Sequence, residues 1–197
     1  CASVGADAGH LHEKQQRHKK KCMHEIIYRQ LGPADLAEYR RVRISCLEQY
    51  PDNFGTTVQE EIGAAVLKLD RSITHADDHN FTLGAFNTGK VLIGICGFLA
   101  ETRIKTQHRG EVVQMFVDAG YNGQGIGMAL LQQVIDKAFS SPLIEQIILS
   151  AVYENKNALK LYERAGFIEY GRLGNYFKSG TGYTTQSFFV LNKPGRQ

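Results

Sequence analysis

The sequence lacks a long hydrophobic run, and this absence removes membrane-spanning proteins from consideration. Among its 197 residues, no apolar stretch reaches the roughly 18 residues that a membrane-crossing helix needs. The N-terminal end also lacks the apolar segment of a secretory signal peptide. Cysteine is scarce: there are four, and no two are spaced as Cys-x-x-Cys. Cys96 falls in an apolar strand and Cys46 in an expected helix, and both are predicted to be buried hydrophobes. We therefore predict a reducing, cytoplasmic setting, no membrane partner and no bound metal.

Positive charge is in excess only near the N-terminal end of the chain. The formal net charge is +3. Residues 1–23 contain five Lys/Arg and two Asp/Glu, so residues 24–197 contain 18 of each sign and are neutral. The main part of the chain therefore has no basic excess for nucleic acid, and we predict no nucleic-acid partner. We expect residues 1–22 to form a disordered or appended basic leader, with Met23 as the native start.

Hydrophobic periodicity predicts seven strands and four helices in one domain over residues 23–197. Asp35 is expected to cap the first helix, and Thr57 with Glu60 forms a capping box at the start of the second. This order predicts an α+β fold with a mixed sheet, and no internal repeat or second domain is visible. The expected strands are 25–31, 81–86, 91–101, 111–117, 144–152, 170–178 and 183–191, and the expected helices are 36–49, 58–73, 126–139 and 157–164.

A glycine-rich turn follows the apolar strand at 112–117. Gly123, Gly125 and Gly127 stand at alternate positions, and a segment with helical periodicity begins at Ile126. Glycine permits positive φ and a close backbone approach, while the first turn of a helix offers unpaired N–H groups and a partial positive charge. The segment therefore predicts an anion site, most simply for the pyrophosphate of a cofactor.

Two familiar phosphate motifs do not fit this turn. A P-loop requires Gly-Lys-Ser/Thr at its end, and no Lys-Ser/Thr pair follows here. The dinucleotide fingerprint Gly-x-Gly-x-x-Gly/Ala fails because its last position is Met128 or Leu130, depending on the starting glycine. A Rossmann oxidoreductase is therefore disfavoured. Taken by itself, this segment could also be a glycine-rich turn that binds no ligand.

A second segment reads Asn155-x-x-Ala-x-x-x-Tyr162-x-x-x-Gly166-Phe167. Together with Asn122-x-x-Gly-x-Gly, it resembles the motifs of the GCN5-related N-acetyltransferase (GNAT) family. The resemblance covers roughly residues 23–192 and is specific over about 110–168. One departure is Asn122, where the family usually has Gln or Arg; it implies weaker side-chain support for the pyrophosphate.

The resemblance implies a GNAT-like mixed, largely antiparallel seven-stranded sheet flanked by about four helices. In that fold a splayed parallel strand pair, here 111–117 and 144–152, holds acetyl-CoA as co-substrate. Backbone N–H groups near Met115 to Val117 would hold the thioester carbonyl and stabilise the oxyanion of a tetrahedral intermediate. The cofactor-binding residues implied are Met115, Phe116, Val117, Asn122, Gly123, Gln124, Gly125, Ile126, Gly127, Met128, Asn155 and Tyr162.

The implied reaction is direct attack of a primary amine, on a small molecule or a peptide, on the acetyl thioester. A protonated amine must lose a proton first, so a carboxylate base is useful. Glu101 is the first choice and Glu111 the second, although both could simply solvate the hairpin between them. Tyr162 is expected to donate a proton or a hydrogen bond to the leaving thiolate. Its other interpretation is a core tyrosine.

Several other residues carry alternative interpretations. Asn155 is either a contact to the pantetheine arm or a turn residue at a helix entry, and Gly166-Phe167 is expected to be structural. On the first helix, Arg43 could meet an acidic substrate group, but a solvated helix face is the commoner explanation for its arginines. Loops 50–54 and 176–183 are expected to shape the acceptor pocket.

Two further functions stay open at this point. A non-catalytic acetyl-CoA sensor would keep the glycine turn and lose the chemistry. A basic-tailed adaptor would bind nucleic acid through residues 1–22 with steep salt dependence. A homodimer through the final strand pair is a third open point.

Overall fold

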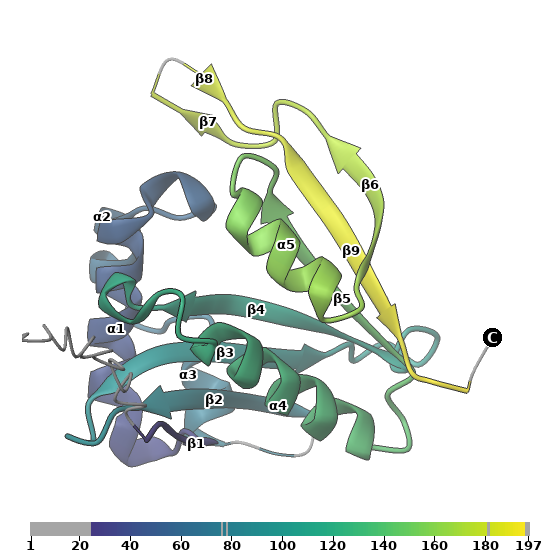
Figure 1. Ribbon diagram of the computed structural model, residues 1–197, viewed down its shortest axis with the longest axis horizontal. Helices are drawn as coiled ribbons and strands as arrows, with labels where there is room; N and C mark the ends of the chain where they lie inside the picture. The colour runs from purple at the N-terminus through teal and green to yellow at the C-terminus, as the bar shows by residue number, and fades with distance from the viewer. Residues whose placement is uncertain (1–24, 76, 78, 181, 196–197) are drawn as a thin grey trace, which may run out of the picture.

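A computed structural model describes residues 25–75, 77, 79–180 and 182–195. Its centre is a seven-stranded sheet in the order β1-β2-β3-β4-β5-β9-β6, with a small β7–β8 hairpin outside it. β4 and β5 are parallel, and the other neighbours in the main sheet are antiparallel (Figure 1). The predicted mixed, largely antiparallel fold is therefore confirmed. The strands are β1 (Ile27–Gln30), β2 (Asn80–Phe86), β3 (Leu92–Ala100), β4 (Arg109–Val117), β5 (Gln146–Val152), β6 (Ile168–Leu173), β7 (Lys178–Ser179), β8 (Gly182–Tyr183) and β9 (Gln186–Asn192).

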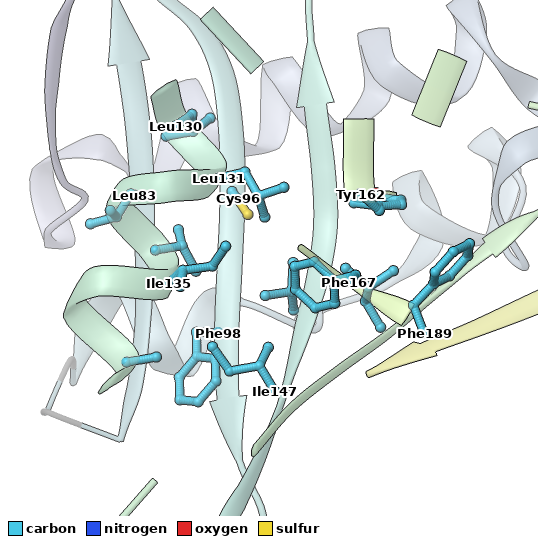
Figure 2. Packing of buried hydrophobic residues seen from close by; sticks show 14 of the residues in the cluster. Leu83, Cys96, Phe98, Leu130, Leu131, Ile135, Ile147, Tyr162, Phe167 and Phe189 are labelled. Carbon is cyan, nitrogen blue, oxygen red and sulfur yellow. The ribbon is translucent and has the colours of Figure 1, made fainter. Parts of the chain in front are cut away.

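Helices cover the sheet through two separate apolar clusters. The helices are α1 (Leu36–Gln49), α2 (Val58–Gly63), α3 (Asp70–Thr74), α4 (Ile126–Ser140) and α5 (Lys156–Arg164). In one cluster, Leu131 and Ile135 of α4 pack with Cys96 of β3 and Phe167 (Figure 2). In the other, Tyr39 and Cys46 of α1 pack with Ile95 of β3. Neighbouring residues of β3 thus serve different clusters, as the alternation of side chains along a strand requires.

The expected second helix, 58–73, is wrong as a single element. The predicted capping box of Thr57 and Glu60 is present, but α2 ends at Gly63 and the next residue has extended backbone (φ −79°, ψ 126°). Glycine is a poor helix former, and the chain resumes helical geometry only at α3. There Asp70 accepts a hydrogen bond from the Leu67 N–H at 2.9 Å and pairs with Arg40. The structure consequently has five α-helices in the described part of the chain, rather than about four.

Asp35 also differs from its expected role at the start of α1. It makes no side-chain capping bond to α1. Its carboxylate instead accepts the Gly32 N–H at 2.9 Å and pairs with Arg29 at 2.7 Å, which closes the short 3-10 turn before the helix.

Several remaining expectations can be checked against the described residues. Cys46 and Cys96 are free and buried, as predicted. Cys1, Cys22 and the whole leader lie outside the described residues. Of the final strands, β6 is the edge of the sheet and exposes Ile168 and Tyr170, and the homodimer through this region stays a prediction. Within the described ranges, no helix combines the length and apolar character needed to cross a membrane.

Candidate functional site

The parallel strands β4 and β5 pair over only a short segment and then diverge. Their partners run from Arg109↔Gln146 to Glu111↔Ile148, whereas β4 continues to Val117 and β5 to Val152. Figure 1 shows the two strands separating toward α5 and α2. β5 pairs with β9 along its whole length, so only the edge of β5 that faces β4 loses its partner. The backbone of β4 beyond Glu111 is therefore free of ladder bonds on that side.

Two cavities open along this gap. The strand-gap cavity, about 340 Å³, lies between β4 and β5 and is lined by Arg43, Lys68, Glu111, Gln114, Ser150 and Gln186, among others. The glycine-turn cavity, about 710 Å³, is lined by the glycine turn, the start of α4 and one side of α5. Both cavities share six lining residues, so they meet: Asn53, Phe54, Met115, Asn155, Ala158 and Tyr162.

The glycine turn adopts a backbone that only glycine takes readily. Gly123 and Gly125 have φ of 73° and 82°, and a side chain at either would meet no atom within 4 Å. The need for glycine is therefore conformational rather than steric. Gly125 is the N-cap of α4, so the N–H groups of the first turn, beginning at Ile126, have no partner within the helix. Their dipoles favour an anion in the adjoining cavity.

The sequence-derived cofactor set falls almost entirely on this one cavity. Of its twelve residues, eleven line the glycine-turn cavity; Gln124 is exposed and does not. The lining members are Met115, Phe116, Val117, Asn122, Gly123, Gly125, Ile126, Gly127, Met128, Asn155 and Tyr162. Most of these residues lie together because β4, the glycine turn and α4 are consecutive in the chain. Asn155 and Tyr162 join them because α5 lines the same cavity. Their binding of a cofactor stays a prediction.

Asn122, the departure from the family pattern, holds the turn to another loop. Its Nδ2 donates a hydrogen bond to the Tyr50 hydroxyl at 3.2 Å. Tyr50 follows α1 and packs edge-on against Phe116, with ring centroids 6.1 Å apart. The side chain thus links the glycine turn to the α1–α2 loop.

Tyr162 stands where the two cavities meet. Its side chain is 7% exposed and packs against Phe167 and Phe189 at centroid distances of 6.1 and 5.9 Å (Figure 2). Burial raises the pKa of its hydroxyl above the usual range. The hydroxyl is therefore a hydrogen-bond donor that stays protonated. The core interpretation of Tyr162 agrees with its packing, while its action on a leaving thiolate stays a prediction.

Asn155 has the helix-entry role expected of it, and its contact to a pantetheine arm stays a prediction. Its Oδ1 accepts the Ala158 N–H at 3.1 Å and caps α5, while the residue lines both cavities. Gly166 ends the α5 region with φ of 93°, and Phe167 is buried. The structural role expected of these two residues is confirmed.

The interpretation of Arg43 as part of a solvated helix face is wrong. Arg43 is 3% exposed, and its Nε donates to Glu61 Oε1 at 2.7 Å. Its guanidinium also lies 4.9 Å from the centre of the Phe54 ring. The reason is tertiary: α2 folds back beside α1 and brings Glu61 with it. Arg41 does keep an exposed position, paired with Glu38 at 3.0 Å.

The two candidate bases lie in different places. Glu101 accepts a hydrogen bond from Thr106 Oγ1 at 3.4 Å in the β3–β4 connection and lines neither cavity. Glu111 lines the strand-gap cavity and pairs with Lys68 at 3.6 Å. Of the two candidate bases, only Glu111 therefore lines the cavity that Tyr162 also lines.

Sequence reasoning missed several lining residues. Lys160 and Arg164 place two cations on the α5 side of the glycine-turn cavity, and their spacing of four on a helix was a usable signal. Gln186 gave no signal, because it joins the strand-gap cavity only through the pairing of β9 with β5. Among the described residues, no group of three or more His, Cys, Asp or Glu is arranged to hold a metal ion.

Comparison with known proteins matches residues 40–167 to the model of the acetyltransferase (GNAT) family. The N-alpha-acetyltransferase MAK3 of Arabidopsis thaliana is 35% identical over 96 residues, which are 49% of this chain and 49% of that protein. The spermidine N(1)-acetyltransferase of Vibrio cholerae is 28% identical over 103 residues, 52% of this chain and 58% of that protein. The chain thus spans about half the length of these curated relatives.

Solved structures agree on the fold. A GNAT-family acetyltransferase from Streptococcus pneumoniae superposes with a TM-score of 0.74 at 21% identity, covering 86% of this chain and 100% of that one.

Proposed function

The chain belongs to the GNAT family of acetyltransferases, and from this we propose that it transfers the acetyl group of acetyl-CoA to a primary amine. The observation that carries the proposal is the meeting of the two cavities at Tyr162. An anion-binding turn and a gap lined by polar side chains share one junction there. Transfer between two substrates requires such a junction, because the reacting atoms must approach within about 3–3.5 Å.

The residues of the glycine-turn cavity fit the charge of acetyl-CoA. Gly123 and Gly125 provide the left-handed backbone that leads into α4, whose first turn offers free N–H groups to a pyrophosphate. Lys160 and Arg164 add positive charge on the opposite wall. Asn155, at the junction, would contact the pantetheine arm. When bound, acetyl-CoA supplies a thioester that an amine can attack directly.

Three groups of the chain would then act on the reaction: backbone N–H groups of β4, the carboxylate of Glu111 and the hydroxyl of Tyr162. Backbone N–H groups in the stretch Met115 to Val117, freed where β4 leaves β5, would stabilise the developing oxyanion. Glu111 would accept the proton of the attacking amine, directly or through water. We choose Glu111 over Glu101 because only Glu111 lines the strand-gap cavity.

Tyr162 would stabilise the leaving thiolate by a hydrogen bond. An ordinary thiol has a pKa near ~8.5 and an ordinary tyrosine near ~10. Burial raises the pKa of Tyr162 further, which opposes complete proton transfer and favours a donated hydrogen bond. The hydroxyl would therefore lower the energy of the thiolate without itself becoming an anion.

The alternative is an acetyl-CoA sensor without catalysis. Such a protein needs the glycine-turn cavity only. The polar strand-gap cavity beside it, with Glu111 and Arg43, supports the enzyme instead.

The deciding experiment begins with calorimetric titration of the full chain with acetyl-CoA, with NAD as control. We expect binding of acetyl-CoA in the micromolar range and none of NAD. A panel of amines, followed by release of the free thiol, then separates the enzyme from the sensor. Absence of acetyl-CoA binding would remove both functions together.

A further inference from the structure

The strand-gap cavity contains two buried polar groups that the protein itself leaves unpaired. Several described side chains carry a buried nitrogen or oxygen without a hydrogen-bond partner. Of these, only Arg43 and Gln186 line either cavity. The unpaired atoms are Nη1 of Arg43 and Oε1 of Gln186, on side chains that are 3% and 5% exposed. One is a donor and the other an acceptor.

Arg43 is fixed in place before any acceptor arrives. Its Nε is bound to Glu61 at 2.7 Å, and the face of the guanidinium lies over Phe54. Glu61 is carried by α2, whose start is closed by the Thr57–Glu60 capping box. The ion pair neutralises the charge and sets the orientation, so Nη1 is a positioned donor. A buried donor without a partner is destabilising, which a purely structural role for Arg43 does not explain.

Gln186 occupies the opposite wall. It is the first residue of β9 and lies opposite Val152, the last residue of β5, in the antiparallel register. It therefore stands on the side of the gap that β5 forms. Gln186 and Arg43 line the same cavity but belong to different elements, β9 and α1.

We propose that Arg43 and Gln186 recognise the N-terminal residue of a peptide as the acetyl acceptor. The reacting amine donates a hydrogen bond to Gln186 Oε1, and the first carbonyl oxygen accepts one from Arg43 Nη1. This inference rests on the proposed acetyltransferase function and names its substrate class. A polyamine or alkylamine has no oxygen that could accept a hydrogen bond from Nη1.

The charges in the cavity favour a neutral carbonyl over a free carboxylate. Arg43 is paired with Glu61, and Lys68 is paired with Glu111 at 3.6 Å. No uncompensated positive charge therefore remains among these groups to pair with an acid. The amine and the neighbouring peptide carbonyl together satisfy both unpaired atoms, and the carbonyl adds no charge.

The test compares acceptors on the full chain with saturating acetyl-CoA. A set of dipeptide amides is measured against matched alkylamines without the carbonyl, against spermidine and against free amino acids. Because α-amines and alkylamines differ in pKa (about 8 against about 10.4), kcat/KM is calculated for the neutral amine. We expect the dipeptide amides to be preferred by about 10-fold or more.

Variants then test the two residues. Arg43→Lys keeps a cation beside Glu61 but removes Nη1, and should reduce the preference for dipeptide amides by about 10-fold, to near parity with the alkylamines. Gln186→Met should lower kcat/KM for every amine by about 10-fold. Arg41→Lys makes the same exchange on the exposed face of α1 and should change nothing. Calorimetry with acetyl-CoA should give the same Kd for all four proteins.

Each outcome has a separate meaning. Equal or better use of alkylamines, spermidine or free amino acids, with normal acetyl-CoA binding, overturns the inference and leaves the acetyltransferase intact. An unchanged acceptor preference in a folded Arg43→Lys protein also overturns it. Should that variant fail to fold, the acceptor comparison on the unmodified protein decides alone. Loss of acetyl-CoA binding in the unmodified protein removes the underlying function and this inference with it.

Discussion

The two cavities that meet at Tyr162 are built in different ways. The glycine-turn cavity owes its chemistry to backbone: two glycines with positive φ and the first turn of α4. The strand-gap cavity owes its chemistry to side chains from separate elements, among them Arg43 of α1 and Gln186 of β9. Backbone N–H groups suit a ligand that every relative shares, because they survive changes of side chain. Side chains suit the partner that differs from one protein to the next.

The largest effect should come from breaking the support of the strand-gap cavity. Glu61→Ala leaves the buried guanidinium of Arg43 without its carboxylate and should lower the free energy of unfolding by about 3–5 kcal/mol. Urea unfolding measures this change. Glu38→Ala, which removes the exposed ion pair with Arg41 on α1, should cost about 0.5 kcal/mol or less. Similar losses of unfolding free energy for the two variants would show that the buried ion pair stabilises the fold no more than the exposed one.

Breaking the backbone of the other cavity should remove the cofactor and spare the fold. Gly125→Val places a β-branched residue at φ 82°, where such residues are rarely found. We expect acetyl-CoA affinity to fall by about 100-fold or more, because the start of α4 must rearrange. Calorimetry is the measurement. Gly174→Val, at a glycine with open space and no positive φ, is the matched control and should bind normally.

The junction can be tested through Tyr162 alone. Tyr162→Phe should lower turnover by about 10- to 100-fold while leaving the Kd for acetyl-CoA within about 2-fold. Tyr170→Phe, at an exposed tyrosine, is the control. Steady-state kinetics with an active amine, beside calorimetry, separates the two effects. A large loss of cofactor affinity would instead assign Tyr162 to binding.

The pH dependence of the same residue has a definite sign. Because burial raises the folded-state pKa of Tyr162, the hydroxyl stays protonated as the pH rises through the usual tyrosine range near ~10. The Tyr162-dependent part of the rate should therefore persist up to about pH 10. The ratio of wild-type to Tyr162→Phe turnover, followed from pH 7 to 10, checks it, and a falling ratio in that interval would contradict a buried, protonated hydroxyl.

The smallest effect is expected at Asn122. Replacing it by the family's usual residue, Asn122→Gln, alters the contact to Tyr50 but not the glycine backbone. Acetyl-CoA affinity should change by about 2- to 5-fold, because side-chain support is secondary to the N–H groups. Calorimetry distinguishes this from the loss expected at Gly125.

The two cavities also differ in how much of each could be predicted from the sequence. The glycine turn is local: strand, turn and helix are consecutive, so its residues and their order suffice. The end of α2 at Gly63 had a local signal in the sequence, but the start of α3 did not, because Asp70 is held there by Arg40, a contact made only in the folded chain. The burial of Arg43 and the place of Gln186 were missed for the same reason, since neither burial nor the β5–β9 register can be read from their neighbours in sequence.

The junction between the cavities also constrains the order of events in catalysis. Because the two cavities differ in all but six of their lining residues, we expect the proposed acetyl-CoA and amine to bind at the same time. The two described cysteines, Cys46 and Cys96, line neither cavity, so neither is placed to carry the acetyl group between half-reactions. Initial-rate plots at several fixed amine concentrations should therefore give intersecting lines, the kinetic signature of a ternary complex rather than of a ping-pong enzyme.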